Sequence, residues 1–594
     1  MPDAEAAPGA AGGGFAASLL RGGAAALCMA LAFPPVGWWP LVLAWPALVA
    51  HAAITARSRR AAFLGLWLPH AIAWLVLDAW LIDVAALGWP LLAMYMGLWP
   101  ALVGLLVRPA RPGGPLGGVP VALVLAAAWA GVETLRGVVL FDGYPWYLLA
   151  HPLAEWPPAV QSAAWLGADF TGFLAAMVSG ATIDAAAAWR GRRAGRVPGV
   201  RVASAIAGGL LAVGLPLLGG RAIAAVDAVV ADDPAAADRD RPLRVLLVQT
   251  ALPQDNKIGW PLEDQVASLV RWLEMAREAA ERSRRGEGGL APAAPDLVIF
   301  PETMVPGFGF EPSVRQRLES LGDVRADFAT AIEQLAADTG ATVLAGTVHV
   351  ASLDVEPVPG GGMRYVAGPR TNAVTAVGPG GPIDRYDKSF LTPFGETMPY
   401  ISAWPWLEQR LLAVAARGMQ FDLEAGPGDR RLELPRADGS SVHVAAPICF
   451  EITVPATVHG LVRGGDLPPA DLILNASNDG WFGDSAGGRR RHAQIARLRA
   501  IEHRRPVVRA VNTGYSMVID PAGRITDRLG AGDYGTMGLE GVLVADVPRP
   551  GRQPMTTAYA RRGPVWPFLA LGLLLVTAVA GSFRRPSVSG VRDD

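Results

Sequence analysis

Seven long apolar stretches occupy the first 225 residues of the chain, and an eighth lies close to its C-terminal end. They run over Ala16–Phe33, Trp39–Ile54, Ala61–Ile82, Pro90–Val107, Val119–Val139, Leu166–Ala188, Ala203–Ala225 and Val565–Phe583. Most approach the ~20 apolar residues that a helix needs to cross a bilayer. The chain is 51% apolar and only 18% charged, whereas soluble domains carry about 25% charged residues. We therefore predict a polytopic α-helical membrane domain of about eight spans.

The charges of the connecting loops predict an orientation for these spans. The loops after the first, third and fifth stretches contain no Lys or Arg. Arginine clusters follow the second, fourth, sixth and eighth stretches, at Arg57, Arg59, Arg60, Arg108, Arg111, Arg190, Arg192, Arg193, Arg196, Arg584, Arg585 and Arg592. Because basic loop residues stay on the cytoplasmic side, we expect both termini to be cytoplasmic and residues 226–563 to lie outside.

The segment before the last apolar stretch has the pattern of a water-facing domain. After an acidic, alanine-rich linker, short apolar runs typical of strands alternate with amphipathic stretches typical of helices. Strands are predicted over 243–250, 295–300, 341–350, 372–378, 442–450, 470–477 and 507–512, helices over 263–284, 324–338 and 490–503, and surface loops over 284–294 and 355–370. This pattern predicts a layered α/β domain with a largely buried sheet.

The predicted organisation therefore has four parts. They are a seven-span membrane domain at 1–226, a linker at 227–242, an α/β domain at 243–550, and a final span with its tail at 551–594. The net charge of −1 lacks the positive excess that is typical of nucleic-acid-binding proteins. The two cysteines, Cys28 and Cys449, exclude a disulfide scaffold and a cysteine-rich metal site. The eight histidines show no metal-ligand spacing, so neither a metal nor another cofactor is expected.

Lysine is almost absent from the chain. Of 52 basic residues 50 are arginine, and the two lysines are Lys257 and Lys388. A GC-rich genome explains the bias but not the two exceptions. Arginine serves wherever a fixed charge is enough, whereas a compact ammonium that can shift its pKa requires lysine. Each lysine is thus a candidate for chemistry.

Three residue types in the outer domain together suit acyl transfer. Cys449 and Glu302 each end a predicted strand, where α/β folds place reactive groups, and Lys388 lies in a loop. Taken singly, they also fit a buried inert thiol, a surface carboxylate and a solvated loop charge. Taken together, a thiol can attack, a carboxylate can take its proton, and an ammonium can stabilise the oxyanion.

Several motifs around these residues resemble a known family. They are FPETMVPG (300–307), YDKSFLTPFGETMP (386–399), PICFEI (447–452), SNDGWFGDSAG (477–487), HAQIARLRAIEHRRPVVRAVNTG (492–514), ETLRGVVLFDGYPW (133–146) and LAFPPVGWWPL (31–41). The outer domain resembles the nitrilase superfamily, whose Glu–Lys–Cys triad occurs in this order. The whole chain resembles the apolipoprotein N-acyltransferase family of bacterial inner membranes. The resemblance implies a periplasmic nitrilase-like α-β-β-α sandwich beside the membrane domain.

The resemblance also implies roles for individual residues. Glu302 would be the general base, Lys388 the oxyanion partner, Cys449 the nucleophile and Glu396 a second essential glutamate. The residues expected to line, gate or support the site are Glu451, Phe450, Trp260, Trp481 and Asn372. The family often has Tyr where this chain has Phe450, and the spacing from Lys257 to Trp260 also departs from its pattern.

The implied reaction has two half-steps and two lipid-anchored substrates. Cys449 would take an acyl chain from a membrane phospholipid as a thioester, and the thioester would acylate the N-terminal α-amine of a diacylglyceryl-cysteine lipoprotein. Two alternatives remain open from the residues. One is a membrane-tethered amidase acting on a small soluble amide, and the other is a non-enzymatic lipid-binding or transport protein.

Several other charged or polar residues stand out, four within the membrane part and a run of arginines at the start of a predicted outer-domain helix. Glu133 and Arg136 share one helical face and suit either an ion pair or a lipid-headgroup contact. His70 and Asp78 are expected to join helices rather than to catalyse. The run Arg489–Arg491 is expected to be a solvated helix start that could also meet anionic headgroups.

Overall fold

The computed structural model describes two compact units, one comprising residues 1–162, 167–218 and 565–594 and the other residues 163–166 and 219–564. The described residues are 14–583 without 195–198, 232–241, 254–259, 309, 359–362, 405, 407, 409, 411–422, 429, 437–438, 466–467 and 549–555. The candidate Lys257, most of the expected linker, Arg196 and the arginines after the last span lie outside the described residues.

All eight apolar stretches form helices. They are α1 (Phe15–Ala32), α2 (Leu41–Thr55), α3 (Arg59–Leu77), α5 (Gly88–Val107), α6 (Val121–Thr134), α9 (Ala168–Arg193), α10 (Gly199–Ala231) and α19 (Trp566–Ser582). Among the described residues, six helices are long and apolar enough to cross a membrane, while α2 and α19 are shorter apolar helices. The short helices α4 (Leu81–Ala85), α7 (Ala150–Leu153) and α8 (Ala163–Leu166) lie between them in sequence. The chain is thus a multi-pass membrane protein.

Polar side chains join elements inside the first unit. Trp45 of α2 donates its indole N–H to Nε2 of the buried His70 of α3, at 3.0 Å. The Tyr147 hydroxyl donates to Asp78, which follows α3, at 2.5 Å. His70 and Asp78 therefore have the joining role expected of them.

Glu133 and Arg136 both bind backbone groups of the segment that follows α6. Glu133 Oε1 accepts a hydrogen bond from the Leu149 N–H at 2.9 Å. Arg136 donates to the carbonyl of Trp146 at 2.6 Å and to that of Tyr144 at 3.1 Å. Neither interpretation of this pair from the sequence included such a backbone role.

The second unit contains two six-stranded sheets. The first has the order β14–β1–β2–β3–β6–β7, with β1 (Leu243–Gln249), β2 (Leu297–Ile299), β3 (Thr342–Val350), β6 (Arg370–Gly378), β7 (Gly381–Asp387) and β14 (Gly541–Val547). The second has the order β13–β12–β11–β10–β9–β8, with β8 (Leu432–Pro435), β9 (Ser441–Ala445), β10 (Leu472–Ser477), β11 (Val507–Val511), β12 (Met517–Ile519) and β13 (Ile525–Arg528). The pairs β1–β2, β2–β3, β9–β10 and β10–β11 are parallel.

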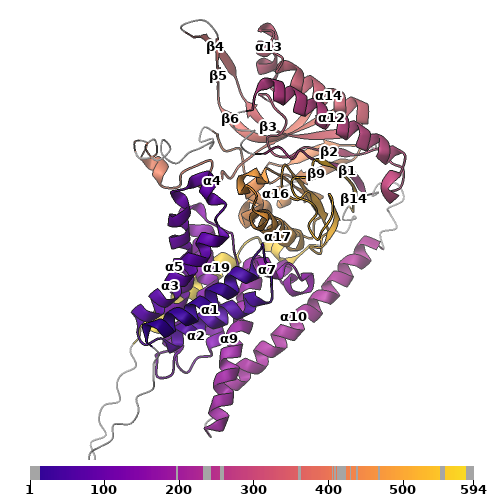
Figure 1. The fold of residues 1–594 in the computed structure, drawn as a ribbon. Helices are drawn as coiled ribbons and strands as arrows, with labels where there is room; N and C mark the ends of the chain where they lie inside the picture. Colours follow the sequence, from indigo (N-terminus) through magenta and orange to yellow (C-terminus); the bar gives the residue numbers. More distant parts are fainter. Residues whose placement is uncertain are drawn as a thin grey trace, which may run out of the picture. The chain divides into compact units, whose positions relative to one another are not determined.

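The two sheets pack face to face between helices (Figure 1). Side chains along β1 alternate between the two faces of the first sheet. Val245 and Leu247 belong to the core that this sheet shares with the second sheet, whereas Leu246 and Val248 belong to the core between this sheet and its helices. Those helices are α12 (Leu262–Arg284) and α14 (Ala326–Thr339), while α16 (Pro455–Arg463) and α17 (Ala486–His503) contribute to the core of the second sheet. The predicted α-β-β-α sandwich is confirmed, and both faces of its sheets are buried, as near-continuous apolar strands require.

The expected loop at 355–370 is wrong over much of its length. Strand β4 (Leu353–Pro357) pairs antiparallel with β5 (Met363–Ala367) in a separate two-stranded sheet. The prolines and glycines within residues 357–362 are typical of a loop in the sequence. Apolar contacts stabilise the base of the hairpin, where Leu353 is buried in a small apolar cluster and Tyr365 packs against that cluster.

Candidate active site

Cys449 is the first residue of a short 3-10 helix (Cys449–Thr453) that follows strand β9. Its φ of 50° lies in the left-handed region, which costs a non-glycine residue about 1–2 kcal/mol. Burial, followed by the carboxylate of Glu302, raises the pKa of the thiol, while Lys388 acts in the opposite direction. The thiol is therefore protonated at rest and needs a base before it can attack.

Lys388 follows strand β7, and its side chain is only 1% exposed. Its Nζ lies 2.7 Å from Glu396 Oε2 and 3.6 Å from Glu302 Oε1. Burial works to lower the pKa of this amine, but the charges of Glu396 and then Glu302 outweigh it and raise the pKa above its usual value. Lys388 is thus a fixed ammonium between two carboxylates.

Glu302 follows strand β2 and is held from two sides. The Asn372 side chain, on β6, donates to Oε1 at 2.7 Å, and the Asn478 backbone N–H donates to Oε2 at 2.8 Å. Both oxygens therefore have a defined partner, and the carboxylate cannot rotate freely. The structure brings Glu302, Lys388 and Asn372 together, and the charges of Glu302 and Lys388 shift the pKa of the Cys449 thiol in opposite directions.

Glu396 closes its own loop as well as pairing with the lysine. Its Oε2 accepts from the Thr392 backbone N–H at 2.8 Å, and its Oε1 accepts from Lys388 at 2.9 Å. Burial works to raise the pKa of Glu396, but the adjacent lysine outweighs it and holds the pKa below its usual value. The supporting role predicted for Glu396 has a clear geometric basis here.

Glu451 joins the lysine loop to the cysteine turn. Its Oε1 accepts from the backbone N–H groups of Ser389 at 2.8 Å and Phe390 at 2.9 Å, and its Oε2 accepts from that of Ile448 at 2.7 Å. The side chain is fully buried. These contacts fix the lysine loop and the cysteine turn to one buried carboxylate, rather than placing Glu451 at the surface of an open site.

The three aromatic candidates have different surroundings. Phe450 is buried and stacks on Phe390, with ring centroids 6.1 Å apart. Trp260 packs 6.0 Å from Trp272 of α12 and against the core on that face of the first sheet. Trp481 is half-buried in the short helix Asp479–Phe482. A substrate-lining role for Trp260 and Trp481 stays a prediction.

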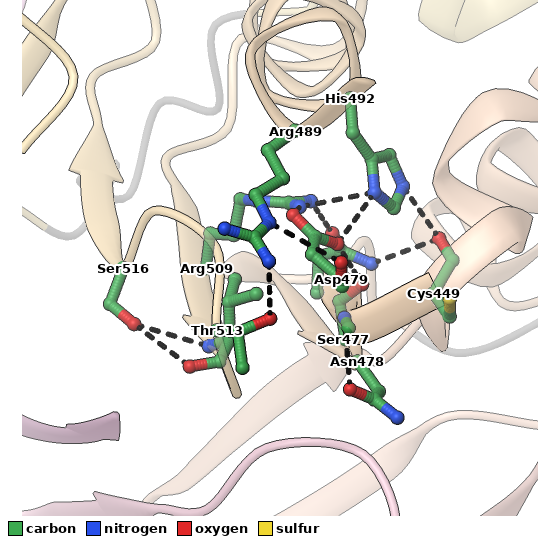
Figure 2. Close-up of polar contacts among 12 residues, drawn as sticks. Cys449, Ser477, Asn478, Asp479, Arg489, His492, Arg509, Thr513 and Ser516 are labelled. Atoms are coloured by element: carbon green, nitrogen blue, oxygen red, sulfur yellow. Dashed lines mark hydrogen bonds and ion pairs between the residues drawn. The ribbon is translucent and has the colours of Figure 1, made fainter. Parts of the chain in front are cut away.

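A buried polar network lies behind Cys449 (Figure 2). His492 Nε2 donates to the Cys449 carbonyl at 3.1 Å, and His492 Nδ1 lies 3.0 Å from Asp479 and 3.1 Å from Arg509. Arg509 also pairs with Asp479 Oδ2 at 2.6 Å and donates to the side-chain oxygen of Asn475. The sequence motifs contained Asp479, His492 and Arg509, and Asn475 lies on the predicted strand 470–477, but nothing in their spacing assigned these residues a role.

The arginines at the start of α17 are largely buried, so the expected solvated helix start is wrong. Arg489 is 6% exposed and Arg491 1% exposed. Arg489 donates to the backbone carbonyl of Gly483 and, at 3.2 Å, to the Thr513 hydroxyl. Most residues of the helix are buried, and the Arg489 guanidinium reaches oxygen atoms of the protein instead of water. A run of charges on a buried helix cannot be told from a solvated one by sequence pattern alone.

Comparison with known proteins agrees with this geometry. Residues 25–181 match the family model "Apolipoprotein N-acyltransferase N-terminal domain", and residues 247–556 match "Carbon-nitrogen hydrolase". The apolipoprotein N-acyltransferase of Ralstonia nicotianae is 31% identical over 93% of this chain and 91% of its own. Those of Rhodopseudomonas palustris (30% identical, covering 84% of this chain and 80% of the relative) and Methylococcus capsulatus (32%, covering 73% and 70%) are similar.

The sandwich and its matched model define an acyltransferase of the carbon-nitrogen hydrolase superfamily that is carried on a multi-pass membrane segment. More narrowly, the chain belongs to the apolipoprotein N-acyltransferase family. Among the described residues, no group of three or more side chains is arranged to hold a metal ion.

Proposed function

We propose that this protein transfers an acyl chain from a membrane phospholipid to the N-terminal α-amine of a diacylglyceryl-cysteine lipoprotein. The observation that carries the proposal is the buried Lys388 ammonium between Glu302 and Glu396, with its charge acting on the Cys449 thiol. Membership of the apolipoprotein N-acyltransferase family supports the choice of lipid and lipoprotein as substrates.

In the first half-reaction, Glu302 takes the proton of the Cys449 thiol as its sulfur attacks the ester carbonyl of the phospholipid. Because the pKa of the thiol is raised by burial, proton removal and attack must occur together. The ammonium of Lys388 stabilises the oxyanion. When the C–O bond breaks, Glu302 returns the proton to the leaving oxygen, and a lysophospholipid departs.

In the second half-reaction, the neutral α-amine of the lipoprotein attacks the thioester carbonyl. Glu302 takes a proton from the attacking nitrogen, and Lys388 again faces the oxyanion. The C–S bond breaks, the amide forms, and the proton on Glu302 returns to the sulfur. This ping-pong sequence leaves the enzyme unchanged and requires no cofactor.

Both substrates are anchored in a membrane, which supports a location for the α/β domain at the membrane surface. We propose the bacterial inner membrane, with this domain on the periplasmic side and both termini in the cytoplasm. The arginine clusters of the loops support this orientation, because basic residues are retained inside.

Intact-protein mass spectrometry tests the first half-reaction. Detergent-purified protein is incubated with a phospholipid of defined acyl chains, beside Cys449→Ala and, as the matched control, Cys28→Ala, which removes the cysteine of helix α1. We expect a hydroxylamine-labile mass gain of one acyl chain in the wild type and in Cys28→Ala. An adduct that persists in Cys449→Ala, or no adduct at all, contradicts the proposal. Hydrolysis of small amides without an adduct would favour a tethered amidase.

A second incubation tests the acceptor. Loaded enzyme is mixed with a synthetic diacylated lipopeptide that has a free α-amine, or with the same peptide after N-acetylation. We expect the adduct to disappear, with formation of an N-acyl peptide, only for the free amine. Equal loss of the adduct with both peptides indicates hydrolysis by water and contradicts transfer.

A further inference from the structure

The backbone carbonyl of Cys449 is held by two side chains from behind the nucleophile. His492 Nε2 donates to it at 3.1 Å, and Asn475 Nδ2 donates to it at 3.3 Å. A non-glycine residue at φ 50° persists only where its surroundings determine its conformation. These two donors are therefore part of what keeps the thiol in place.

Arg509 decides which way Asn475 faces. This arginine lies on β11, is fully buried, and donates through Nη1 to the Asn475 side-chain oxygen. With its oxygen bound, Asn475 must direct its NH₂ the other way, where it reaches Pro447 O at 2.9 Å as well as Cys449 O. A flipped amide would bring two oxygens together and leave Arg509 opposed to an NH₂ group.

Arg509 also decides which nitrogen of His492 carries the proton. Its Nη2 lies 3.1 Å from His492 Nδ1, while Asp479 Oδ1 lies 3.0 Å from the same nitrogen. Burial, and then the charge of Arg509, lower the pKa of His492 and favour the neutral ring, while Asp479 acts in the opposite direction. A neutral ring that accepts from Arg509 at Nδ1 has its hydrogen at Nε2, where it can donate to Cys449. Without the guanidinium, Asp479 would draw that hydrogen to Nδ1, and the Nε2 lone pair would face the carbonyl.

We propose that Arg509 is a positioning residue for the nucleophile, because one guanidinium orients both side chains that hold the Cys449 carbonyl. It touches no reacting atom and acts through His492 and Asn475. Its consequence for acyl transfer rests on the proposed function, whereas its consequence for the placement of the thiol does not.

The test compares Arg509→Lys with Arg244→Lys. Arg244 is also buried, and its guanidinium also binds several partners, donating to Asp546 at 2.6 Å and to Ser283 at 2.8 Å. It lies on β1, in the other sheet. Lysine keeps the charge, but its single nitrogen cannot take both positions that Nη1 and Nη2 of Arg509 occupy. We expect the single-turnover acylation rate of Arg509→Lys to fall by roughly 100-fold with an unchanged KM for the phospholipid, since small misplacements of reacting groups have effects of that order. Arg244→Lys should keep its rate. Equal losses in both variants, or a loss in KM alone, overturn the proposal.

Two His492 variants keep the proposal testable if Arg509→Lys is poorly folded, and a double-mutant cycle adds to them where it is folded. His492→Leu removes one donor, and His492→Gln supplies an amide N–H in its place. We expect His492→Gln to recover much of the rate lost in His492→Leu. We also expect Arg509→Lys combined with His492→Leu to lose less than the product of the single losses, because the two act through one contact. The proposal is overturned if the rate losses of the two single variants multiply in the double variant, or if His492→Gln recovers none of the rate lost in His492→Leu.

Alkylation of Cys449 by iodoacetamide, followed by peptide mass spectrometry, gives a readout without phospholipid. We expect Arg509→Lys to be alkylated roughly tenfold more slowly than Arg244→Lys at pH 7, because the displaced thiol loses its alignment with Glu302. If wild-type protein takes up no acyl chain but the alkylation difference is found, the proposed function fails and the positioning role stands. Equal alkylation rates overturn the positioning role.

Discussion

Lys388 is paired more closely with Glu396 than with Glu302, at 2.7 Å against 3.6 Å. The carboxylate assigned as base is thus not the main partner of the ammonium. Glu396 compensates most of the charge of the lysine, so Glu302 is left with Asn372 and Asn478 as its hydrogen-bond partners. This division leaves Glu302 able to accept a proton while Lys388 stays charged.

Replacing Glu302 with glutamine should slow thioester formation by about 10²–10⁴-fold, because the thiol loses its base. The shape of the site and the hydrogen bond from the Asn478 N–H can be kept by the amide oxygen. Single-turnover acylation by intact mass measures the effect, and we expect the remaining rate to rise with pH, since hydroxide must then remove the thiol proton. A pH-independent rate close to that of the wild type would show that another group is the base.

Replacing Asn372 with alanine should slow acylation by roughly 10- to 100-fold without changing which residue is acylated, because Glu302 Oε1 loses the donor that orients it. Thr371→Val is the matched control. It lies next to Asn372 on the same strand, and its hydroxyl binds Asp387 instead of the site. Similar losses in both variants would mean that the strand, rather than the contact with Glu302, is responsible.

The pair of Lys388 and Glu396 should stabilise the fold within a defined pH window. The pKa of Glu396 is held below its ordinary 4.5, so its contribution is present above that value and is lost as pH falls through the folded-state pKa. The pKa of Lys388 is raised above 10.5, so its contribution is present below that value and is lost as pH rises through the folded-state pKa. Glu396→Gln should therefore lower Tm most between about pH 5 and 10, and the difference from wild type should shrink in acid. A Tm difference that is as large at about pH 2 as at pH 7 contradicts this assignment.

Replacing Glu451 with glutamine should destabilise the α/β domain by about 1–3 kcal/mol, because an NH₂ group would face buried backbone N–H donors. The acylation rate should fall as well, since Ser389 and Ile448 lose their common partner. Thermal unfolding and single-turnover acylation measure the two effects. Glu433→Gln, on an exposed position of β8, is the control. A lower rate with an unchanged Tm would instead indicate a direct chemical role.

The catalytic candidates could be predicted from the sequence for a physical reason. Glu302 follows the buried strand β2 and Cys449 follows β9, and the carboxyl ends of strands are where α/β folds place reactive groups. Runs of apolar residues identify these two strands. Lys388 follows the partly exposed strand β7, which has no such run, and only the rarity of lysine distinguishes this residue in the sequence before any motif is considered. The helices of the membrane part follow from the length of their apolar stretches.

The residues that hold the nucleophile from behind could not be predicted. In a chain with 50 arginines, nothing in the strand Val507–Val511 distinguishes Arg509 from a residue favoured by base composition. Its importance arises from burial and from partners on β10 and α17, which are far away in sequence. The same reason explains why the prediction of a solvated helix start at Arg489–Arg491 was wrong. Burial by the rest of the domain, and not the local sequence pattern, decides whether a charged side chain is exposed to water.

The contacts of Glu451 have a consequence for the length of the chain. One carboxylate binds Ser389 and Phe390 at one end and Ile448 at the other, so the segment between them, which includes β8 and β9, has its two ends fixed together. Adding residues inside a closed segment changes its closure entropy only slowly, by about 0.6 kcal/mol for each doubling of its length. We therefore expect residues inserted between Phe390 and β8 to leave the contacts of Glu451, and with them the spacing of Lys388 and Cys449, unchanged.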